Sequence, residues 1–154
     1  MVSKAFVPVE LGSAAYLLAS CIGGSDPERH AVTHPAGEWL FREGELVDRV
    51  LFITSGRVEL STLRGSTRVA LSVLAPGDLA GLPAVITGTP TLISGRSLTD
   101  VRGYSISRAT LEKAMEGDPL NLVTISQLLS ARLDSAFAVL RSQRMIRRRY
   151  SRKN

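Results

Sequence analysis

The chemically reactive side chains of this sequence are few, and their spacing points to no catalytic or metal site. His30 and His34 lie four residues apart, a spacing that can place two imidazoles on one helix face for a metal ion. Pro35 and the β-like sequence around it disfavour a helix, and no third ligand is near in sequence. We interpret both histidines as surface or turn residues. Neither lies in a context that would activate a serine nucleophile, so we expect no enzyme activity.

The single cysteine, Cys21, cannot form an intramolecular disulfide or supply the thiolates of an iron–sulfur cluster. We expect a small buried hydrophobe in a reducing, cytoplasmic chain. Residues 18–21 have the form of a lipoprotein cleavage box, but Pro8 and Glu10 interrupt the apolar run that should precede it. No apolar run approaches the ~18 residues that span a bilayer, so we expect no membrane partner.

Positive charge is concentrated at the C-terminal end of the chain. The sequence holds 19 basic and 14 acidic residues, and seven of the basic ones fall in residues 141–154, which contain no acidic residue. The other 140 residues therefore carry 12 basic and 14 acidic side chains, a net charge of −2. The basic end is either a solvated helix end, an arm for nucleic-acid phosphates or a contact with anionic lipid. The candidate nucleic-acid contacts are Arg144, Arg147, Arg148, Arg149, Arg152 and Lys153.

The middle of the chain has the texture of an all-β barrel or sandwich. From His34 onward, short apolar segments are separated by glycines at intervals typical of turns between strands. Strands are predicted over residues 39–41, 50–53, 57–63, 69–74 and 97–106. A hairpin tip is expected at residues 64–66 and a tight turn at residues 76–78.

Helices are predicted on both sides of these strands. A short helix covers residues 11–22 and ends at Gly23 and Gly24. After Ile106 the apolar period becomes helical, and Ser107 is the expected N-cap of a helix that ends at residue 116, before Gly117, Asp118 and Pro119. We divide the chain into an N-terminal helical segment, 1–29; a barrel with its following helix, 30–118; a long helix, 119–146; and a basic tail, 147–154.

The long helix carries an apolar stripe over roughly 25 residues, which is more than a small barrel can cover. We therefore expect the helix to pair with its copy in a homodimer, although the stripe packing only on its own barrel is the alternative. The expected interface residues are Ile125, Leu129, Arg132, Leu133, Ala136, Val139 and Leu140.

Together these features resemble the cyclic-nucleotide-binding domain of bacterial regulators of the catabolite-activator/FNR (Crp/Fnr) type. The resemblance covers about residues 30–145 and is carried by Gly37-x-x-Leu-Phe-x-x-Gly44, Asp48-x-x-Leu-Phe-Ile53 and Gly56-x-Val58. Residues 76–85 are similar to the entry of the family's phosphate-binding cassette. The resemblance implies a mainly β fold with flanking helices: a jelly-roll barrel, also called a double-stranded β-helix, followed by a dimerisation helix.

The resemblance also implies a ligand pocket, whose candidate residues are Gly81, Leu82, Pro83, Ala84, Thr91, Leu92, Arg96, Ala136 and Phe137. Family members that bind a cyclic nucleotide hold its ribose with a carboxylate, where this chain has Leu82. They hold its phosphate with an arginine followed by Ser or Thr, where this chain has Thr91 and Leu92. Arg96 is the nearest cation that might substitute. We therefore predict that cyclic AMP does not bind in the usual way, and we assign no certain cofactor.

Two functions follow from this resemblance. The first is a non-enzymatic sensor in transcriptional regulation, in which an unknown small molecule in the barrel changes the packing of the dimerisation helices. The second is a ligand-free dimerisation scaffold that presents two basic tails to nucleic acid or an acidic partner. DNA would be contacted through the tail or through a helix-turn-helix domain that these 154 residues do not include.

Overall fold

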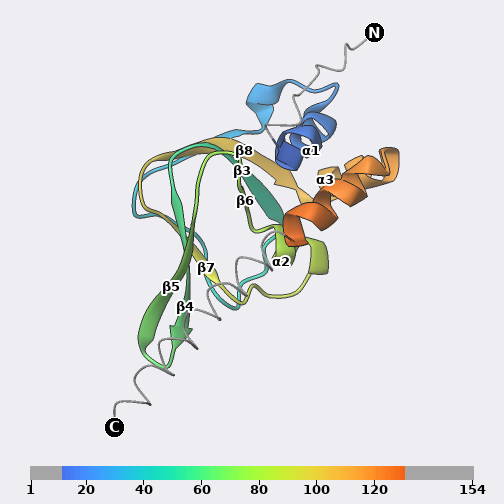
Figure 1. Cartoon of the computed structure of the whole chain (residues 1–154). Helices are drawn as coiled ribbons and strands as arrows, with labels where there is room; N and C mark the ends of the chain where they lie inside the picture. The colour runs from blue at the N-terminus through green and yellow to red at the C-terminus, as the bar shows by residue number, and fades with distance from the viewer. Residues whose placement is uncertain (1–11, 131–154) are drawn as a thin grey trace.

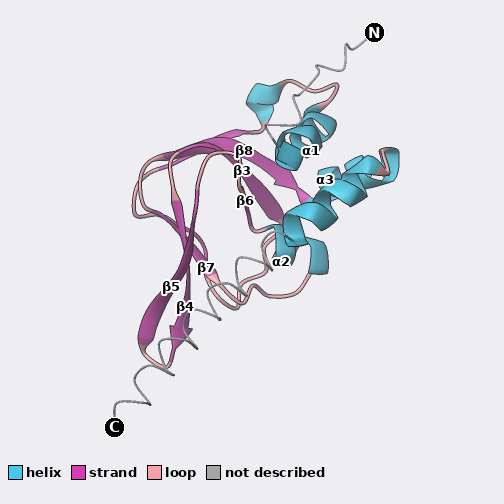
Figure 2. Cartoon of the chain, viewed as in Figure 1, coloured by secondary structure: helices cyan, strands magenta, loops and turns pink. Residues whose placement is uncertain are grey.

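Two four-stranded antiparallel sheets form the barrel, and helices lie against one of them (Figures 1 and 2). The computed structural model describes residues 12–130. The first sheet has the order β1-β8-β3-β6 and the second the order β2-β7-β4-β5. The strands of the first sheet are β1 Ala31–His34, β8 Val101–Ser107, β3 Arg49–Ser55 and β6 Leu79–Ala80. Those of the second are β2 Trp39–Phe41, β7 Ser94–Ser97, β4 Val58–Arg64 and β5 Thr67–Leu74.

The helices precede, interrupt and follow the strands. Helix α1 spans Gly12–Ile22, and a 3₁₀ turn, η2, spans Pro27–Arg29. Helix α2, Leu82–Thr87, lies between β6 and β7, and helix α3, Arg108–Gly117, follows β8 directly. Residues 120–130 are also helical. Figure 1 shows α1, α2 and α3 grouped at the end of the barrel away from the β4–β5 hairpin.

The apolar run of β3 faces two different cores, because successive side chains of a strand point to opposite faces. Leu51 and Ile53 enter the core between the two sheets, which also contains Phe41, Val58 and Val101. Val50 and Phe52 face the helices and pack in a second core, with Leu17 of α1, Val85 of α2, and Leu111 of α3. A strand covered on both faces reads as a continuous apolar segment, as residues 50–53 do.

Most predicted elements are confirmed. The hairpin between β4 and β5 turns at Gly65 and Ser66, and Ser107 caps α3 by accepting a hydrogen bond from the backbone N–H of Thr110 at 3.2 Å. The predicted segment 97–106 is instead the last residue of β7, a turn, and most of β8. Strands β1 and β6 and helix α2 are not among the predicted elements.

The helical segment 120–130 packs partly on its own chain. Asp118 caps it, because its Oδ1 accepts a hydrogen bond from the backbone N–H of Leu120 at 3.0 Å, and Tyr16 of α1 donates a hydrogen bond to Oδ2 of the same carboxylate. Ile125 is 4% exposed and lies in the helical core. Its assignment to a dimer interface is therefore corrected, because contacts within the chain already cover it. Leu129 is partly buried against the same core.

The exposed apolar side chains of this segment are different ones: Leu120, Leu122 and Val123 are 58%, 52% and 53% exposed. The other residues expected at the dimer interface lie outside the described residues. These are Arg132, Leu133, Ala136, Val139 and Leu140.

Candidate ligand-binding site

Gly81 makes the turn between β6 and α2 at which the sequence predicts a ligand. Its φ of 87° lies in the left-handed region, which glycine adopts without steric cost. A Cβ here would lie 3.1 Å from Cγ1 of Val47 and 3.3 Å from the backbone oxygen of Arg49. Glycine is therefore required by both the backbone conformation and the packing of the turn against the start of β3.

Helix α2 buries the residue that follows this glycine. Leu82 is 3% exposed and Ala84 8% exposed, and both side chains are turned away from solvent. Leu82 packs in the core formed with α1 and α3, not in the core between the sheets. Pro83, at the start of the helix, is exposed and lacks the N–H that another residue would offer to an anion. The position where the family places a ribose-binding carboxylate thus holds a side chain that supports the helices.

Thr91 and Leu92, the positions aligned with the family's phosphate contacts, differ in burial. Thr91 is 6% exposed, and its hydroxyl donates to the backbone oxygen of Ile93 at 2.9 Å. Its backbone N–H donates to the backbone oxygen of Glu45 at 2.9 Å. Leu92 is 85% exposed, so it lines no enclosed pocket among the described residues. Thr91 therefore stabilises the loop before β7, and neither residue offers a cation.

Arg96 does not replace the missing phosphate-binding arginine. The neighbouring Gly95 packs under the ring of Phe41 inside the barrel, where a Cβ would lie 2.7 Å from Cζ of that ring. Because side chains alternate along a strand, Arg96 lies on the outer face. There its Nε donates to the backbone oxygen of Gly37 at 3.0 Å, and its guanidinium lies over Trp39. The expectation that Arg96 contacts a ligand in the barrel is corrected by this placement.

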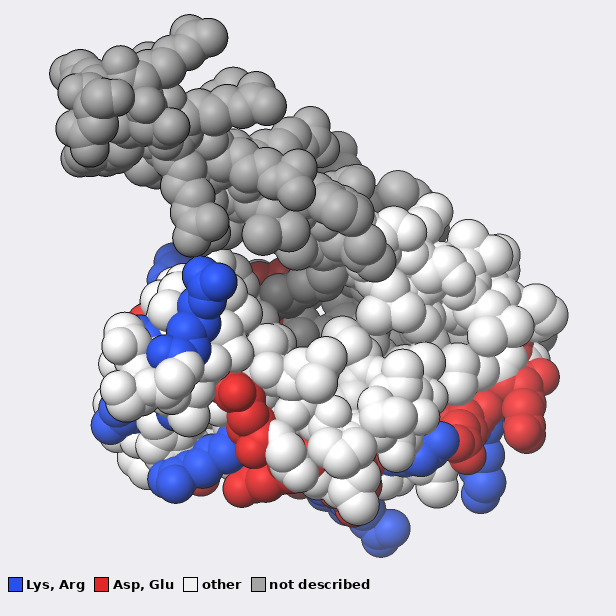
Figure 3. Space-filling model, turned by 90° about the horizontal axis from the view of Figure 1, so that it is seen from below, with Lys and Arg blue, Asp and Glu red and all other residues white. Residues whose placement is uncertain are grey.

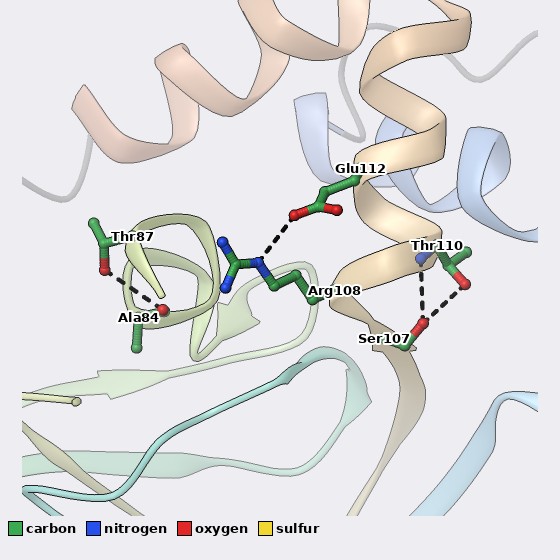
Figure 4. Close-up of polar contacts among 6 residues, drawn as sticks. All are labelled: Ala84, Thr87, Ser107, Arg108, Thr110 and Glu112. Atoms are coloured by element: carbon green, nitrogen blue, oxygen red, sulfur yellow. Dashed lines mark hydrogen bonds and ion pairs between the residues drawn. The ribbon is translucent and has the colours of Figure 1, made fainter. Parts of the chain in front are cut away.

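Arg108, the first residue of α3, lies beside the C-terminal end of helix α2 (Figure 4). The Arg108 guanidinium lies at the C-terminal end of α2, so close that a Cβ on Gly88 would be 2.6 Å from one of its terminal nitrogens. A cation at this end of a helix interacts favourably with the last carbonyls. The Nε of Arg108 also donates to Glu112 of α3 at 3.0 Å. Figure 4 shows Arg108 between the two helices. Arg108 thus brings a cation of α3 next to the end of α2.

One cavity among the described residues, at the β1, β2 and β3 strands and the loop before β3, does not coincide with these positions. It has a volume of about 230 Å³, somewhat below the range typical of small-molecule sites. Both the strands and the loop before β3 contribute apolar and polar residues to its lining. They are His34, Leu40, Phe41, Glu45, Leu46, Val47, Asp48, Arg49, Leu51, Ala80 and Ser105. None of the predicted pocket residues is among them.

The remaining reactive residues, His30, His34 and Cys21, have contacts within the chain. His34 lies in β1, with its Nδ1 2.9 Å from Oε1 of Glu38, while His30 follows η2 and lies 3.2 Å from the Ser25 hydroxyl. No group of three potential metal ligands occurs within residues 12–130. Burial raises the pKa of the Cys21 thiol to about 11, so the thiol stays protonated near neutral pH.

In the part of the chain that the structure describes, no helix is long and apolar enough to cross a membrane.

The two predicted ligand contacts on the long helix, Ala136 and Phe137, lie outside the described residues. So do the candidate nucleic-acid contacts Arg144, Arg147, Arg148, Arg149, Arg152 and Lys153. The described part of the candidate site therefore consists of the β6–α2 turn, helix α2, and the loop that leads to β7.

Comparison with known proteins identifies the fold and the family of this site. A family model described as the cyclic nucleotide-binding domain matches residues 31–118. The chain is 28% identical over 115 residues to the CRP-like cAMP-activated global transcriptional regulator of Mycobacterium tuberculosis, covering 74% of this chain and 51% of that protein. It is 31% identical over 110 residues to an uncharacterised NTE family protein of Mycobacterium bovis, covering 71% of this chain and 17% of that protein. The chain thus spans about half the length of the regulator that it matches.

A solved structure extends the similarity of fold over most of the chain. The cyclic nucleotide-binding domain from Methylobacillus flagellatus has a TM-score of 0.68 and 19% identity, and the match covers 86% of each chain. At this identity the likeness establishes the fold alone.

Proposed function

This chain belongs to the cyclic nucleotide-binding domain family, as a regulatory domain of the catabolite-activator/FNR type, and we propose that it is the ligand-responsive sensor of a transcriptional regulator. The observation that carries this proposal is the arrangement of the phosphate-binding cassette, in which α2 directly follows the turn at Gly81 and ends beside Arg108 of α3. A ligand that shifts α2 would shift α3 and the helical segment that follows it.

We further propose that the ligand is not a cyclic nucleotide bound in the family's usual way. Leu82 supports this proposal, because a buried leucine cannot accept a hydrogen bond from a ribose hydroxyl. Thr91 supports it as well, because its hydroxyl already donates to Ile93. A charge-assisted hydrogen bond to a phosphate contributes about 1.5–3 kcal/mol. Losing the carboxylate and the arginine together weakens binding on the order of a hundredfold to a thousandfold.

The ligand class that suits the described cassette is small and carries less charge than a cyclic nucleotide. Neither Thr91 nor Leu92 provides a cation, and Arg96 is held on the outer face by Gly37 and Trp39. An ionised phosphate placed here would lose its hydration without gaining a guanidinium in return. Calorimetric titration of the full chain with cyclic AMP and cyclic GMP tests this proposal, and we expect no saturable binding in the micromolar range.

The helical segment 120–130 transmits the signal, in our proposal, as the first part of a dimerisation helix. Its two faces support this role, because Ile125 is buried in the core of its own chain while Leu120, Leu122 and Val123 are more than half exposed. The buried face connects the segment to α1 and α3. The exposed apolar face is available to a second copy.

The dimer proposal predicts a specific effect of Leu122→Glu. A carboxylate on the exposed apolar face would have to be buried without a partner in the dimer, so the variant should sediment as a monomer at concentrations where the parent chain is dimeric. Leu122 is 52% exposed in the single chain, so its replacement should leave the fold intact. Analytical ultracentrifugation measures the change.

Leu46→Glu is the matched control for this measurement. Leu46 is 74% exposed and lies in the loop before β3, outside the helical segment. This variant should keep the dimer. A parent chain that is monomeric, or a Leu122→Glu variant with an unchanged dimer, would contradict the assignment of this face.

A further inference from the structure

Three arginines surround the only tryptophan of the chain on the outer face of the second sheet. The guanidinium carbons of Arg42, Arg68 and Arg96 lie 5.2, 4.6 and 5.2 Å from the centroid of the Trp39 ring. Arg96 of β7 is directly opposite Trp39 of β2 in the sheet, and Arg68 reaches the ring from β5. Each of these distances is within the range of a cation–π interaction. We call these four residues the arginine–tryptophan cluster.

The cluster is fixed in position by hydrogen bonds as well as by the indole ring. Arg68 donates to the hydroxyl of Ser61 at 2.9 Å, and Ser61 is itself 1% exposed. Arg96 donates through Nε to the backbone oxygen of Gly37 at 3.0 Å. The guanidinium of Arg42 makes no hydrogen bond to a residue within 12–130. Since each guanidinium has five N–H donors, most donors of the cluster remain available at the surface.

The charge of the cluster is not neutralised by ion pairs. The ion pairs among residues 12–130 are His34–Glu38 and Arg108–Glu112, and neither includes a member of the cluster. Two carboxylates are near the cluster, one in the sheet and one next to Arg42 in the chain. Glu59 lies opposite Arg96 in the register of β4 and β7, and Glu43 accepts a hydrogen bond from the backbone N–H of Leu63 at 2.7 Å.

Figure 3 shows basic side chains gathered on the side of the molecule where β4 and β5 lie, with acidic side chains beside them. Three like charges held around one ring repel one another, and the indole offsets this repulsion only in part. A bound anion would reduce the remaining repulsion between the three guanidinium groups.

We propose that the arginine–tryptophan cluster is a contact surface for the phosphate backbone of nucleic acid. The guanidinium fork matches the geometry of a phosphate, and its positions are already ordered, so little conformational entropy is lost on binding. We favour a polymer as the partner because the sequence carries further positive charge in residues 141–154, and a nucleic acid presents phosphates along its whole length. The contact is to the backbone, and therefore independent of base sequence.

Fluorescence anisotropy of the full chain with a labelled random-sequence DNA duplex, across about 50–200 mM salt, tests the proposal. Arg42→Gln should reduce the slope of log K against log salt by about 0.9, and the triple variant Arg42→Gln/Arg68→Gln/Arg96→Gln by about 2.7. Arg42→Gln should leave the fold intact, because the guanidinium of Arg42 makes no hydrogen bond within the described residues. Since Trp39 is the only tryptophan, its emission should also change when the duplex binds the parent chain.

Arg102→Gln is the matched control, since Arg102 is an exposed arginine of β8 in the other sheet. It removes the same charge and should leave the slope within error of the parent value. Equal slopes for Arg42→Gln and Arg102→Gln, or unchanged Trp39 emission, would overturn the proposal. Polyglutamate that changes Trp39 emission where the duplex does not would also overturn it, and would assign the cluster to an acidic polypeptide. No small ligand enters this assay, so its outcome is independent of the sensor proposal.

Discussion

Replacing Gly103 with alanine is expected to unfold the barrel or to destabilise it by more than about 4 kcal/mol. A Cβ on Gly103 would lie 1.9 Å from the backbone oxygen of Phe52 and 2.9 Å from its carbonyl carbon. Gly103 of β8 pairs with Ile53 of β3 on one side and with Val32 of β1 on the other. The clash is with backbone, so it can be relieved only by separating the central strands of the first sheet and breaking their hydrogen bonds.

Urea denaturation followed by circular dichroism measures this effect, with Gly117→Ala as its control. Gly117 ends α3, and a Cβ there would meet no atom within 4 Å. The control should therefore change the free energy of unfolding by less than about 1 kcal/mol, since alanine is also the better helix former. A Gly103→Ala protein as stable as the parent would mean that β3 and β8 are not paired as described.

Leu82→Glu is expected to destabilise the fold by about 3 kcal/mol or more, and not to create a ribose contact. Leu82 is 3% exposed and packs in the core shared by α1, α2 and α3. The new carboxyl group would be desolvated there, so its pKa in the folded state would rise above its unfolded value. The stability of the variant relative to the parent should then fall as the pH rises above about 4.3, the ordinary value for a glutamate.

Leu92→Glu makes the same chemical change at the other leucine aligned with a ligand position. Leu92 is 85% exposed, so its variant should stay within about 0.5 kcal/mol of the parent at every pH. Thermal melts at pH 4 and pH 7 compare the two variants. If Leu82→Glu melted like the parent at pH 7, the side chain at this position would face solvent or the barrel, and the cassette would be open to a polar ligand.

The overall fold was predictable because its signals are local. Turn glycines between short apolar segments indicate a barrel, and Ser107 followed by an apolar stripe indicates the start of α3. The two-residue strand β6 and the six-residue helix α2 are too short to produce a period in the sequence. Ile125 was assigned to the wrong partner for a similar reason. An apolar stripe shows that a helix face is buried, but not whether its own chain or a second copy buries it.

The site was less predictable, because it depends on which face of a strand or helix a residue occupies. Arg96 follows Gly95 in a strand with no clear alternation, and only the packing of Gly95 under Phe41 places the arginine outside the barrel. The arginine–tryptophan cluster was missed altogether. Its members come from β2, β5, β7 and the residue after β2, and the pairing of strands that brings them together is not local information.

The central proposal, that this barrel does not hold a cyclic nucleotide in the usual way, is tested most directly by isothermal titration calorimetry. The full chain is titrated with cyclic AMP and with cyclic GMP, and a regulator with an intact cassette is titrated alongside as a positive control. We predict no saturable heat in the micromolar range for either nucleotide, because Leu82, Thr91 and Arg96 offer the ribose and phosphate no partner. Micromolar binding of either nucleotide, with a stoichiometry of one per chain, would contradict the account.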